Sequence, residues 1–191
     1  EPKVEDGKFL PFEVFGIKAM SIGFLVNEEQ AIVWRGPMLA KGLDGLINKT
    51  IWGDLDYLIV DFPPGTGDVQ ISMSQKLKLD GTLIITTPQL LSLKDVIRGI
   101  NMFIKVDVPI LGVVENMSYL EEQNEKKYIF GESKTKSLLL KENINLIEEL
   151  PFNLNVPKSC DEGKPYCFDY KDDYSLKFEN ITNAITKKFQ S

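Results

Sequence analysis

Three short runs of almost continuous apolar residues stand out in the hydrophobic pattern of the chain. They are residues 57–62, 83–87 and 110–114, and each ends in polar or loop-forming residues. Runs of this kind are typical of strands buried on both faces of a parallel sheet, because helices cover both sides of such a sheet. A fourth strand is expected at 144–150. The pattern therefore predicts the strands of one central sheet.

Between these runs, apolar residues recur at the spacing of helices with one buried face. Helices are predicted from Pro37 to Lys49 and at 92–104, 134–141 and 175–189. Strands that alternate with amphipathic helices indicate right-handed βαβ units. We therefore predict an α/β fold, a mostly parallel, doubly wound sheet with helices on both faces, in a single domain over residues 1–191.

The beginning of the chain has a weaker pattern. Residues 1–16 mix prolines, phenylalanines and charges without a clear period, which predicts an irregular lead-in segment. Residues 17–33 contain short apolar runs broken at 27–30, which predict two short strands or a strand and a turn. The sequence holds no internal repeat and no low-complexity tract.

Composition excludes several classes of function. The 191 residues include 22 Lys and Arg against 28 Asp and Glu, for a net charge of −6, and no histidine. Without histidine there is no Ser-His-Asp triad and no imidazole zinc site, and the acidic balance argues against nucleic acid. No apolar stretch is long enough to span a bilayer. Two cysteines fit a reducing compartment, the cytoplasm or an organelle matrix such as that of a mitochondrion or plastid.

The first predicted strand ends at Asp61, and a rigid loop of prolines and glycines, residues 63–68, follows it. A carboxylate at a strand tip can hold Mg²⁺ through water, and an N–H group near Gly65 can respond to a terminal phosphate. The alternative is an ordinary turn in which local N–H groups satisfy Asp61 and the prolines only set the shape. Ligands of such sheets bind beyond the carboxyl ends of the strands, which also directs attention to residues 86–89 and 115–119.

The block YLIVDFPPGTGD at 57–68 resembles the Walker B and switch II segment of the Mrp/ApbC family of deviant P-loop ATPases, relatives of MinD and the nitrogenase iron protein. Further segments resemble signatures of this family in the same order, at 20–25, 34–38, 86–89 and 113–118. The resemblance implies a SIMIBI-type P-loop NTPase fold. It also implies ATP binding, dimerisation and the handling of iron–sulfur clusters, as in other members.

The resemblance assigns roles to particular residues. Asp61 would be the Walker B carboxylate that acts on Mg²⁺ through water, and Gly65 with Thr66 would lie beside the γ-phosphate. Asn116 would contact adenine, since an amide both donates and accepts. The loop Pro151-Phe152-Asn153 would lie near the base as well. Taken without the resemblance, Asn116 could instead be an amide that caps a turn at the end of a strand.

The P-loop motif G-x-x-x-x-G-K-[ST] does not occur in these 191 residues. The Gly-Lys pairs are at 7–8 and 163–164, and the residues that follow them are Phe9 and Pro165. In the family that loop lies upstream of the part that matches from Ile17 onward. We therefore expect this chain to be the C-terminal portion of a longer ATPase, incomplete at its N-terminal side and inactive by itself.

The usual cluster ligands of the family are also missing. Bacterial and cytosolic members place a C-x-x-C pair shortly after the E-N-M-S segment, where thiolates of two subunits hold one cluster. Residues 119–128 contain no cysteine here, which resembles the plastid HCF-type branch. Cys160 and Cys167 lie after the predicted base loop at a spacing that fits no metal motif, and we expect isolated thiols there.

Two hypotheses of different classes follow. The first is an ATP-binding iron–sulfur cluster carrier or assembly factor with ATP hydrolysis as a conformational switch. It would act as a homodimer on iron–sulfur client apoproteins, without nucleic acid or membrane as partners. The second is a non-catalytic scaffold that keeps the fold but binds no nucleotide. A positioning ATPase of the MinD/ParA kind would need a basic face or an amphipathic membrane helix, which the sequence does not favour.

Overall fold

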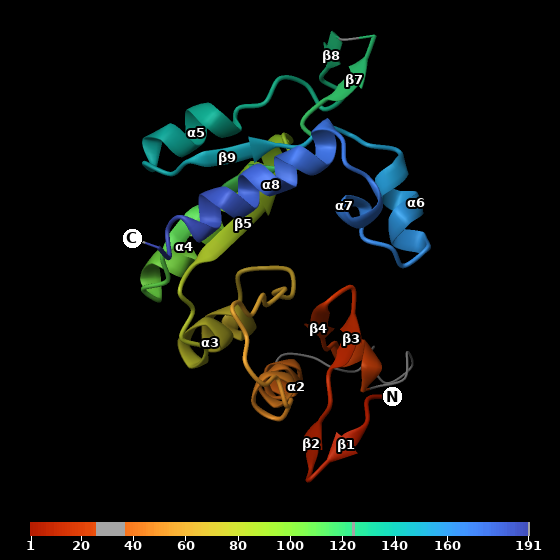
Figure 1. Cartoon of the computed structure of the whole chain (residues 1–191). Helices are drawn as coiled ribbons and strands as arrows, with labels where there is room; N and C mark the ends of the chain where they lie inside the picture. Colours follow the sequence, from red (N-terminus) through yellow and green to blue (C-terminus); the bar gives the residue numbers. More distant parts are fainter. Residues whose placement is uncertain (26–36, 124, 191) are drawn as a thin grey trace. The chain divides into compact units, whose positions relative to one another are not determined.

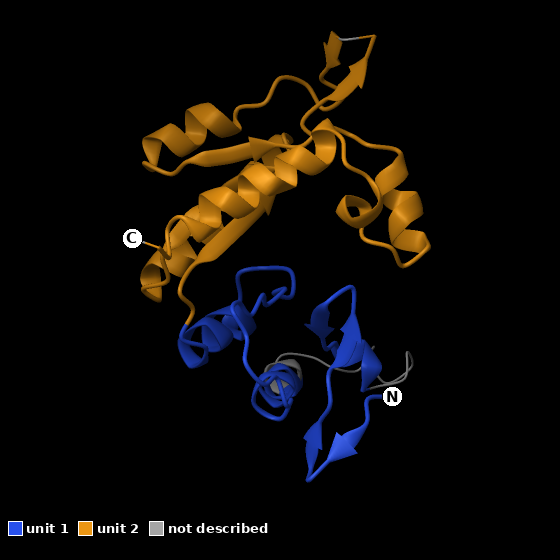
Figure 2. Ribbon diagram, in the orientation of Figure 1, with its two compact units in different colours: residues 1–78 blue, residues 79–191 orange. Residues whose placement is uncertain are grey.

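The computed structural model describes residues 1–25, 37–123 and 125–190 (Figure 1). The chain divides into two compact units (Figure 2). Residues 1–78 make the N-terminal unit, and residues 79–191 make the C-terminal unit. Each unit has its own secondary structure, and the central sheet belongs to the C-terminal one.

The C-terminal unit is built on a parallel sheet of three strands, in the order β5-β6-β9. Strand β5 is Thr82–Thr86, β6 is Ile110–Glu115 and β9 is Leu146–Glu149. Helix α4 (Leu90–Lys105) connects the first pair, and α5 (Thr135–Lys141) lies in the second connection. The remaining elements are β7 (Leu120–Glu122), β8 (Glu125–Lys127), α6 (Asn155–Asp161), α7 (Tyr166–Asp169) and α8 (Asp173–Thr186).

Helices cover both faces of this sheet. Successive side chains of a strand point to opposite faces, so Val113 and Val114 of β6 enter different clusters. Val113 packs with Ile100 of α4 and Leu139 of α5, and all three are essentially inaccessible to solvent. Val114 packs with Ile181 of α8 on the other side. The doubly wound α/β arrangement predicted from the alternating pattern is confirmed for this unit.

The predicted strands at 83–87, 110–114 and 144–150 are each present with boundaries that differ by one or two residues at an end. The helices predicted at 92–104, 134–141 and 175–189 are present as α4, α5 and α8. These elements were predictable because their apolar side chains face a common core.

Gly112 gives the central strand a local irregularity. Its φ is +151°, and the pairing register with β5 shifts between Thr82 and Leu83. A Cβ atom at Gly112 would lie 2.6 Å from the side chain of Ile147 and 3.1 Å from the carbonyl oxygen of Asn145. Glycine therefore allows β6 and the segment leading into β9 to approach closely.

The N-terminal unit begins with two hairpins, so the prediction of an irregular segment at 1–16 is wrong. The described elements are β1 (Val4–Glu5), β2 (Lys8–Phe9), β3 (Phe12–Val14), β4 (Ile17–Ala19), the 3₁₀ turn η1 (Ile22–Phe24), α2 (Pro37–Asn48) and α3 (Asp68–Lys76). Both hairpins turn through a residue and a glycine with positive φ, Asp6-Gly7 and Phe15-Gly16. This geometry matches the twist of two-stranded ribbons.

The prediction of two short elements over 17–33 is met as far as the structure describes it, by β4 and η1. The second part of that prediction, from residue 26 onward, lies outside the described residues, as do Trp34 and Arg35. The helix predicted to begin at Pro37 is α2, which ends at Asn48.

The central strand predicted at 57–62 is not formed. The backbone there is irregular, and the side chain of Ile59 is 92% exposed. An apolar run supplies only one half of a hydrogen-bonded ladder, and no described strand pairs with this segment. The prediction is therefore wrong for this structure, although the run has the composition of a buried strand.

Candidate functional site

Asp61 lies in the irregular segment that precedes the proline-glycine loop, and its side chain is exposed. It does not end a strand, so the strand-tip geometry expected from the sequence is absent. Among the described residues, no group donates a hydrogen bond to its carboxylate. The alternative in which local N–H groups satisfy Asp61 finds no support in this part of the chain.

The loop after Asp61 is held by a residue that the sequence analysis did not single out, Gln70 in the first turn of α3. Its Nε2 donates to the carbonyl oxygens of Pro63 at 3.1 Å and Pro64 at 2.7 Å, and its Oε1 accepts from the N–H of Gly67 at 3.0 Å. Gln70 is buried, whereas Gly65 is exposed and has a φ of +106°. Its side chain therefore fixes the bend that carries Gly65 and Thr66.

A sequence signal for Gln70 did exist. Glutamine three residues after a helix N-cap commonly returns a hydrogen bond to the N-cap backbone, and Gly67 is the N-cap of α3. The contacts to the two proline carbonyls depend on the shape of the loop, which local patterns do not specify.

Asn116 directly follows β6. Its backbone N–H donates to the carbonyl oxygen of Thr86 at 2.7 Å, which continues the pairing with β5. Its side-chain Oδ1 accepts from the N–H of Met117 at 2.9 Å, and Met117 has a φ of +56°. The Nδ2 group donates to no acceptor among the described residues. Asn116 thus contributes to a turn through its oxygen and keeps a donor for another partner.

The predicted base loop lies at the same end of the sheet as Asn116. The N–H of Leu150 donates to the carbonyl oxygen of Glu115 at 2.8 Å, and the N–H of Phe152 donates to that of Tyr119 at 2.7 Å. These bonds extend the contact between β6 and β9 beyond both strands. Pro151 is buried and Phe152 half-buried. The geometry therefore gathers Asn116, Pro151 and Phe152, while their roles toward a nucleotide stay predictions.

Asp61, Gly65 and Thr66 belong to the N-terminal unit, and Asn116, Pro151 and Phe152 belong to the C-terminal unit. The structure thus describes the two predicted halves of the site separately, a phosphate-side loop and a base-side edge.

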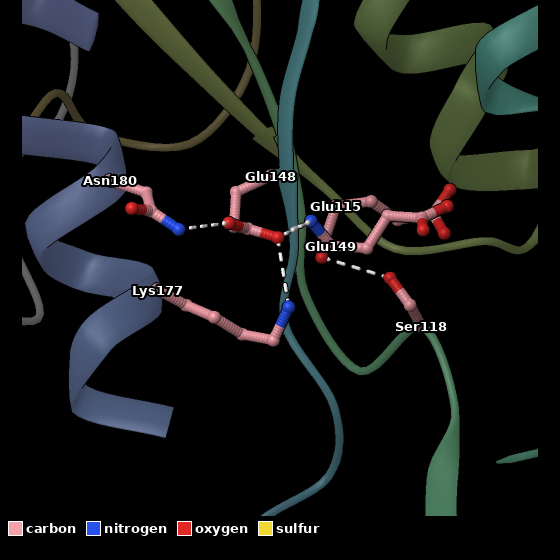
Figure 3. Close-up of polar contacts among 6 residues, drawn as sticks. All are labelled: Glu115, Ser118, Glu148, Glu149, Lys177 and Asn180. Atoms are coloured by element: carbon pink, nitrogen blue, oxygen red, sulfur yellow. Dashed lines mark hydrogen bonds and ion pairs between the residues drawn. The ribbon is translucent and has the colours of Figure 1, made fainter. Parts of the chain in front are cut away.

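Glu115, the last residue of β6, is completely buried. Its Oε2 accepts hydrogen bonds from the hydroxyl groups of Ser133 and Thr135, while its Oε1 has no partner among the described residues. Its main-chain oxygen accepts from Ser118 Oγ at 3.0 Å (Figure 3). The sequence pattern placed this residue in the stretch 115–119 beyond a predicted strand but assigned it no role.

A second cluster of polar side chains connects β9 to α8 (Figure 3). Glu148 accepts from Lys177 Nζ at 2.9 Å and from Asn180 Nδ2 at 3.1 Å. The side chains of Glu148 and Lys177 are only 15% and 23% exposed. Burial raises the pKa of Glu148, but hydrogen bonds from Lys177 and Asn180 outweigh it, so the pKa is lowered. Burial likewise opposes the charge of Lys177, whose pKa is nevertheless raised by the bond to Glu148.

The base loop is also attached to the C-terminal helices. Asn153 Nδ2 donates to the hydroxyl of Tyr166 at 2.8 Å, and that hydroxyl donates to Asp172 Oδ2 at 2.6 Å. Burial and the hydrogen bond to Asp172 raise the pKa of Tyr166. Hydrogen bonds from Tyr166 and from the N–H of Ser175 lower the pKa of Asp172, the N-cap of α8. This network orders the segment after Phe152.

Groups that could hold a metal ion are sparse in the described ranges. Within residues 1–25, 37–123 and 125–190, no three His, Cys, Asp or Glu side chains gather as a metal site would need. Mg²⁺ with a nucleotide commonly uses only one or two protein carboxylates, with phosphate and water completing its shell. The carboxylate of Asp61, which accepts no hydrogen bond from the described residues, fits that requirement. Cys160 and Cys167 are free thiols, and burial raises the pKa of Cys167.

None of the helices in the described part of the chain combines the length and the apolar character needed to cross a bilayer.

Comparison with known protein families shows to which family this chain belongs. The family model described as ParA, NUBPL iron-transfer P-loop NTPase, matches residues 1–187. The chain belongs to this family. The resemblance drawn from five short sequence segments is thereby confirmed. The site residues are therefore interpreted as those of a ParA/NUBPL family member.

Curated relatives of the ParA/NUBPL family agree. The chain is 44% identical over 189 residues to the iron-sulfur cluster transfer protein NUBPL of Dictyostelium discoideum, covering 97% of the chain and 58% of the relative. It is 43% identical over 157 residues to the iron-sulfur cluster carrier protein of Haemophilus influenzae, covering 81% and 42%. The chain thus spans about half the length of the curated relatives it matches.

A solved structure supports the fold. A nucleotide-binding protein from Archaeoglobus fulgidus in complex with ADP matches with a TM-score of 0.74 and 35% identity. The match covers 91% of this chain and 68% of that chain. The P-loop NTPase fold class predicted from sequence is confirmed by this likeness and by the parallel sheet.

Proposed function

We propose that this chain forms the switch loop and the base-facing wall of an ATP-dependent iron–sulfur cluster carrier. The observation that carries the proposal is the loop at 63–67, which Gln70 braces from α3 while the carboxylate of Asp61 beside it stays exposed. A braced loop next to an unbonded carboxylate suits a metal-bound phosphate better than it suits a plain turn. The family membership and the ADP complex of the solved relative support the same conclusion.

The residues divide the work in this proposal. Asp61 accepts hydrogen bonds from water molecules around Mg²⁺, and N–H groups of Gly65 and Thr66 donate to the terminal phosphate. Mg²⁺, when bound, neutralises charge that develops on the phosphates during hydrolysis. Asn116 offers its free Nδ2 to the adenine edge, and Pro151 with Phe152 packs beside the ring. Loss of the γ-phosphate then releases the loop and switches the conformation.

The cargo and partners rest on the relatives. Proteins named iron-sulfur cluster carrier or transfer proteins match most of this chain, and we extend that cargo to it. A cluster uses about four ligands, so the two free thiols Cys160 and Cys167 do not make a site by themselves. We propose a homodimer, with iron–sulfur apoproteins as clients. One relative of Arabidopsis thaliana, 48% identical over 168 residues, is named as mitochondrial, and an organelle matrix joins the cytoplasm as a proposed location.

The test is ATP turnover by the complete natural protein that carries these residues. Asp61→Ala is expected to abolish Mg²⁺-dependent ATP hydrolysis, because it removes the proposed metal-side carboxylate. Asp54→Ala is the matched control, since Asp54 is also an exposed aspartate of the irregular stretch before the loop. Normal turnover in Asp61→Ala would remove the assignment.

Calorimetric titration of the same protein with ATP separates the carrier from a non-catalytic scaffold. The carrier predicts saturable binding that needs Mg²⁺, whereas a scaffold predicts none. Anaerobic reconstitution with iron and sulfide, followed by absorbance, tests the cargo, and a colourless dimer would contradict cluster carriage.

A further inference from the structure

Glu115 is an unusual residue for its place in the fold. It ends a central strand whose other residues are apolar, and it has no exposed surface. Burial of a carboxyl group costs free energy unless hydrogen bonds compensate it. Only its Oε2 receives such bonds, and Oε1 is left without a donor among the described residues. Because this burial is unfavourable, packing alone does not explain a glutamate at this position.

The hydrogen bonds of Glu115 reach a distant stretch of the chain. Ser133 and Thr135, which donate to Oε2, lie 18 and 20 residues further along the sequence. The N–H of Thr135 also donates to Ser133 Oγ at 3.1 Å, so both hydroxyls belong to one turn at the beginning of α5. Glu115 therefore attaches the segment that enters α5 to the end of β6.

That segment carries an aromatic residue against the base loop. The rings of Phe130 and Phe152 lie 5.6 Å apart between centroids, in a tilted arrangement. Phe130 is only three residues before Ser133. By fixing Ser133, Glu115 restricts the position of Phe130 and, through it, the ring of Phe152.

The backbone of Glu115 acts on the same edge. Its carbonyl oxygen accepts from the N–H of Leu150 at 2.8 Å and from Ser118 Oγ at 3.0 Å. The first bond places the residue before Pro151, and the second closes the turn that contains Asn116. One residue is thus bonded, by main chain and side chain, to each segment that borders the base-side edge.

We infer that Glu115 is a positioning residue for the nucleobase, which acts through Asn116 and Phe152 without touching the ligand. This inference rests on the proposed function, because it assumes that the base-side edge receives adenine. The hydrogen bonds that the hydroxyl groups of Ser133 and Thr135 donate to Glu115 set the selectivity for the base. Contacts to the phosphates are independent of these bonds.

The experiment compares ATP, GTP and inorganic triphosphate as probes, by calorimetry on the complete natural protein. Glu115→Leu removes the acceptor at similar size, and Thr135→Val removes one donor and leaves Glu115 in place. Both variants are expected to weaken ATP binding, about tenfold for the first and about threefold for the second, since hydrogen bonds to a buried carboxyl group are lost. Affinity for triphosphate is expected to stay unchanged, and the preference for ATP over GTP is expected to fall.

Two further variants serve as controls. Glu115→Gln keeps an acceptor oxygen for the hydroxyls and should retain most of the ATP preference. Glu121→Leu changes an exposed glutamate of β7 and should bind all three probes like the wild type. Circular dichroism checks that each variant is folded. If Glu115→Leu does not fold, Thr135→Val still tests the inference.

The possible failures differ. If the wild type binds neither ATP nor GTP, the proposed function fails and this inference fails with it. If the wild type binds ATP but the variants lose ATP and triphosphate equally, Glu115 only maintains the fold, and the inference alone is overturned. Unchanged ATP preference in folded Glu115→Leu and Thr135→Val would overturn it as well.

Discussion

Substitution of Gly112 by alanine should strongly destabilise the C-terminal unit. The new Cβ would lie 2.6 Å from the side chain of Ile147 and 3.1 Å from the carbonyl oxygen of Asn145, at a φ of +151°. Overpacking of a core typically costs about 1–3 kcal/mol, and a side chain in a sparsely populated backbone region costs about 1–3 kcal/mol. The lower entropy of the unfolded chain returns about 0.4–1 kcal/mol. We expect a net loss of about 2–5 kcal/mol in the free energy of unfolding.

The assay is urea denaturation of the chain, followed by far-ultraviolet circular dichroism. With a denaturant dependence of about 2 kcal/mol/M, the loss should lower the midpoint by about 1–2.5 M. Gly99→Ala is the matched control, because Gly99 lies inside α4 and a Cβ there would meet no atom within 4 Å. That variant should be more stable by about 0.5–1 kcal/mol. A Gly112→Ala midpoint equal to that of the wild type would refute the claim that close strand approach requires glycine.

Two other predictions concern hydrogen bonds of the same unit. Glu148→Ala should lower the free energy of unfolding at neutral pH by about 1–2 kcal/mol. The pKa of Glu148 is lowered and that of Lys177 is raised. The difference from wild type should therefore vanish as pH falls through the folded pKa of Glu148, or rises through that of Lys177, in urea titrations across pH. A pH-independent difference would contradict this. Tyr166→Phe keeps the ring but leaves Asn153 and Asp172 without its hydroxyl, and should cost about 1–2 kcal/mol in thermal denaturation. Because the pKa of Tyr166 is raised, the cost should disappear as pH rises through its folded value, and an unchanged melting curve at neutral pH would count against the network.

The sequence predicted those elements whose apolar side chains meet a core. Strand β6 is the clearest case, because Val113 and Val114 are both buried, each under different helices. The run at 57–62 has a similar composition but forms no strand, and Ile59 is nearly fully exposed. Hydrophobicity measures the tendency of a segment to be buried, whereas a strand also needs a hydrogen-bonding partner, which composition does not identify. The short hairpins near the N-terminus show the reverse error, since Asp6-Gly7 was a readable turn signal.

For the candidate site, sequence reasoning succeeded where topology alone places a residue. Asn116 and Phe152 follow successive parallel strands, and such strands end at the same edge of a sheet. Sequence reasoning missed the contacts of Gln70 to two proline carbonyls, because only the shape of the loop brings these carbonyls within reach of its side chain. The stretch 115–119 was singled out, but the role of Glu115 within it was missed for a related reason. The hydroxyls that bind this carboxylate are distant in sequence, and a serine or a threonine carries no pattern that marks it as the partner of a buried acid.

Strand β5 has a consequence for handling the chain. It forms one edge of the described sheet, its sequence TLIIT contains no charge and no proline, and Ile85 is 56% exposed. Edge strands without such features are templates onto which other extended chains can add. Concentrated solutions of these 191 residues should therefore become turbid on storage, and Ile85→Lys should keep them clear.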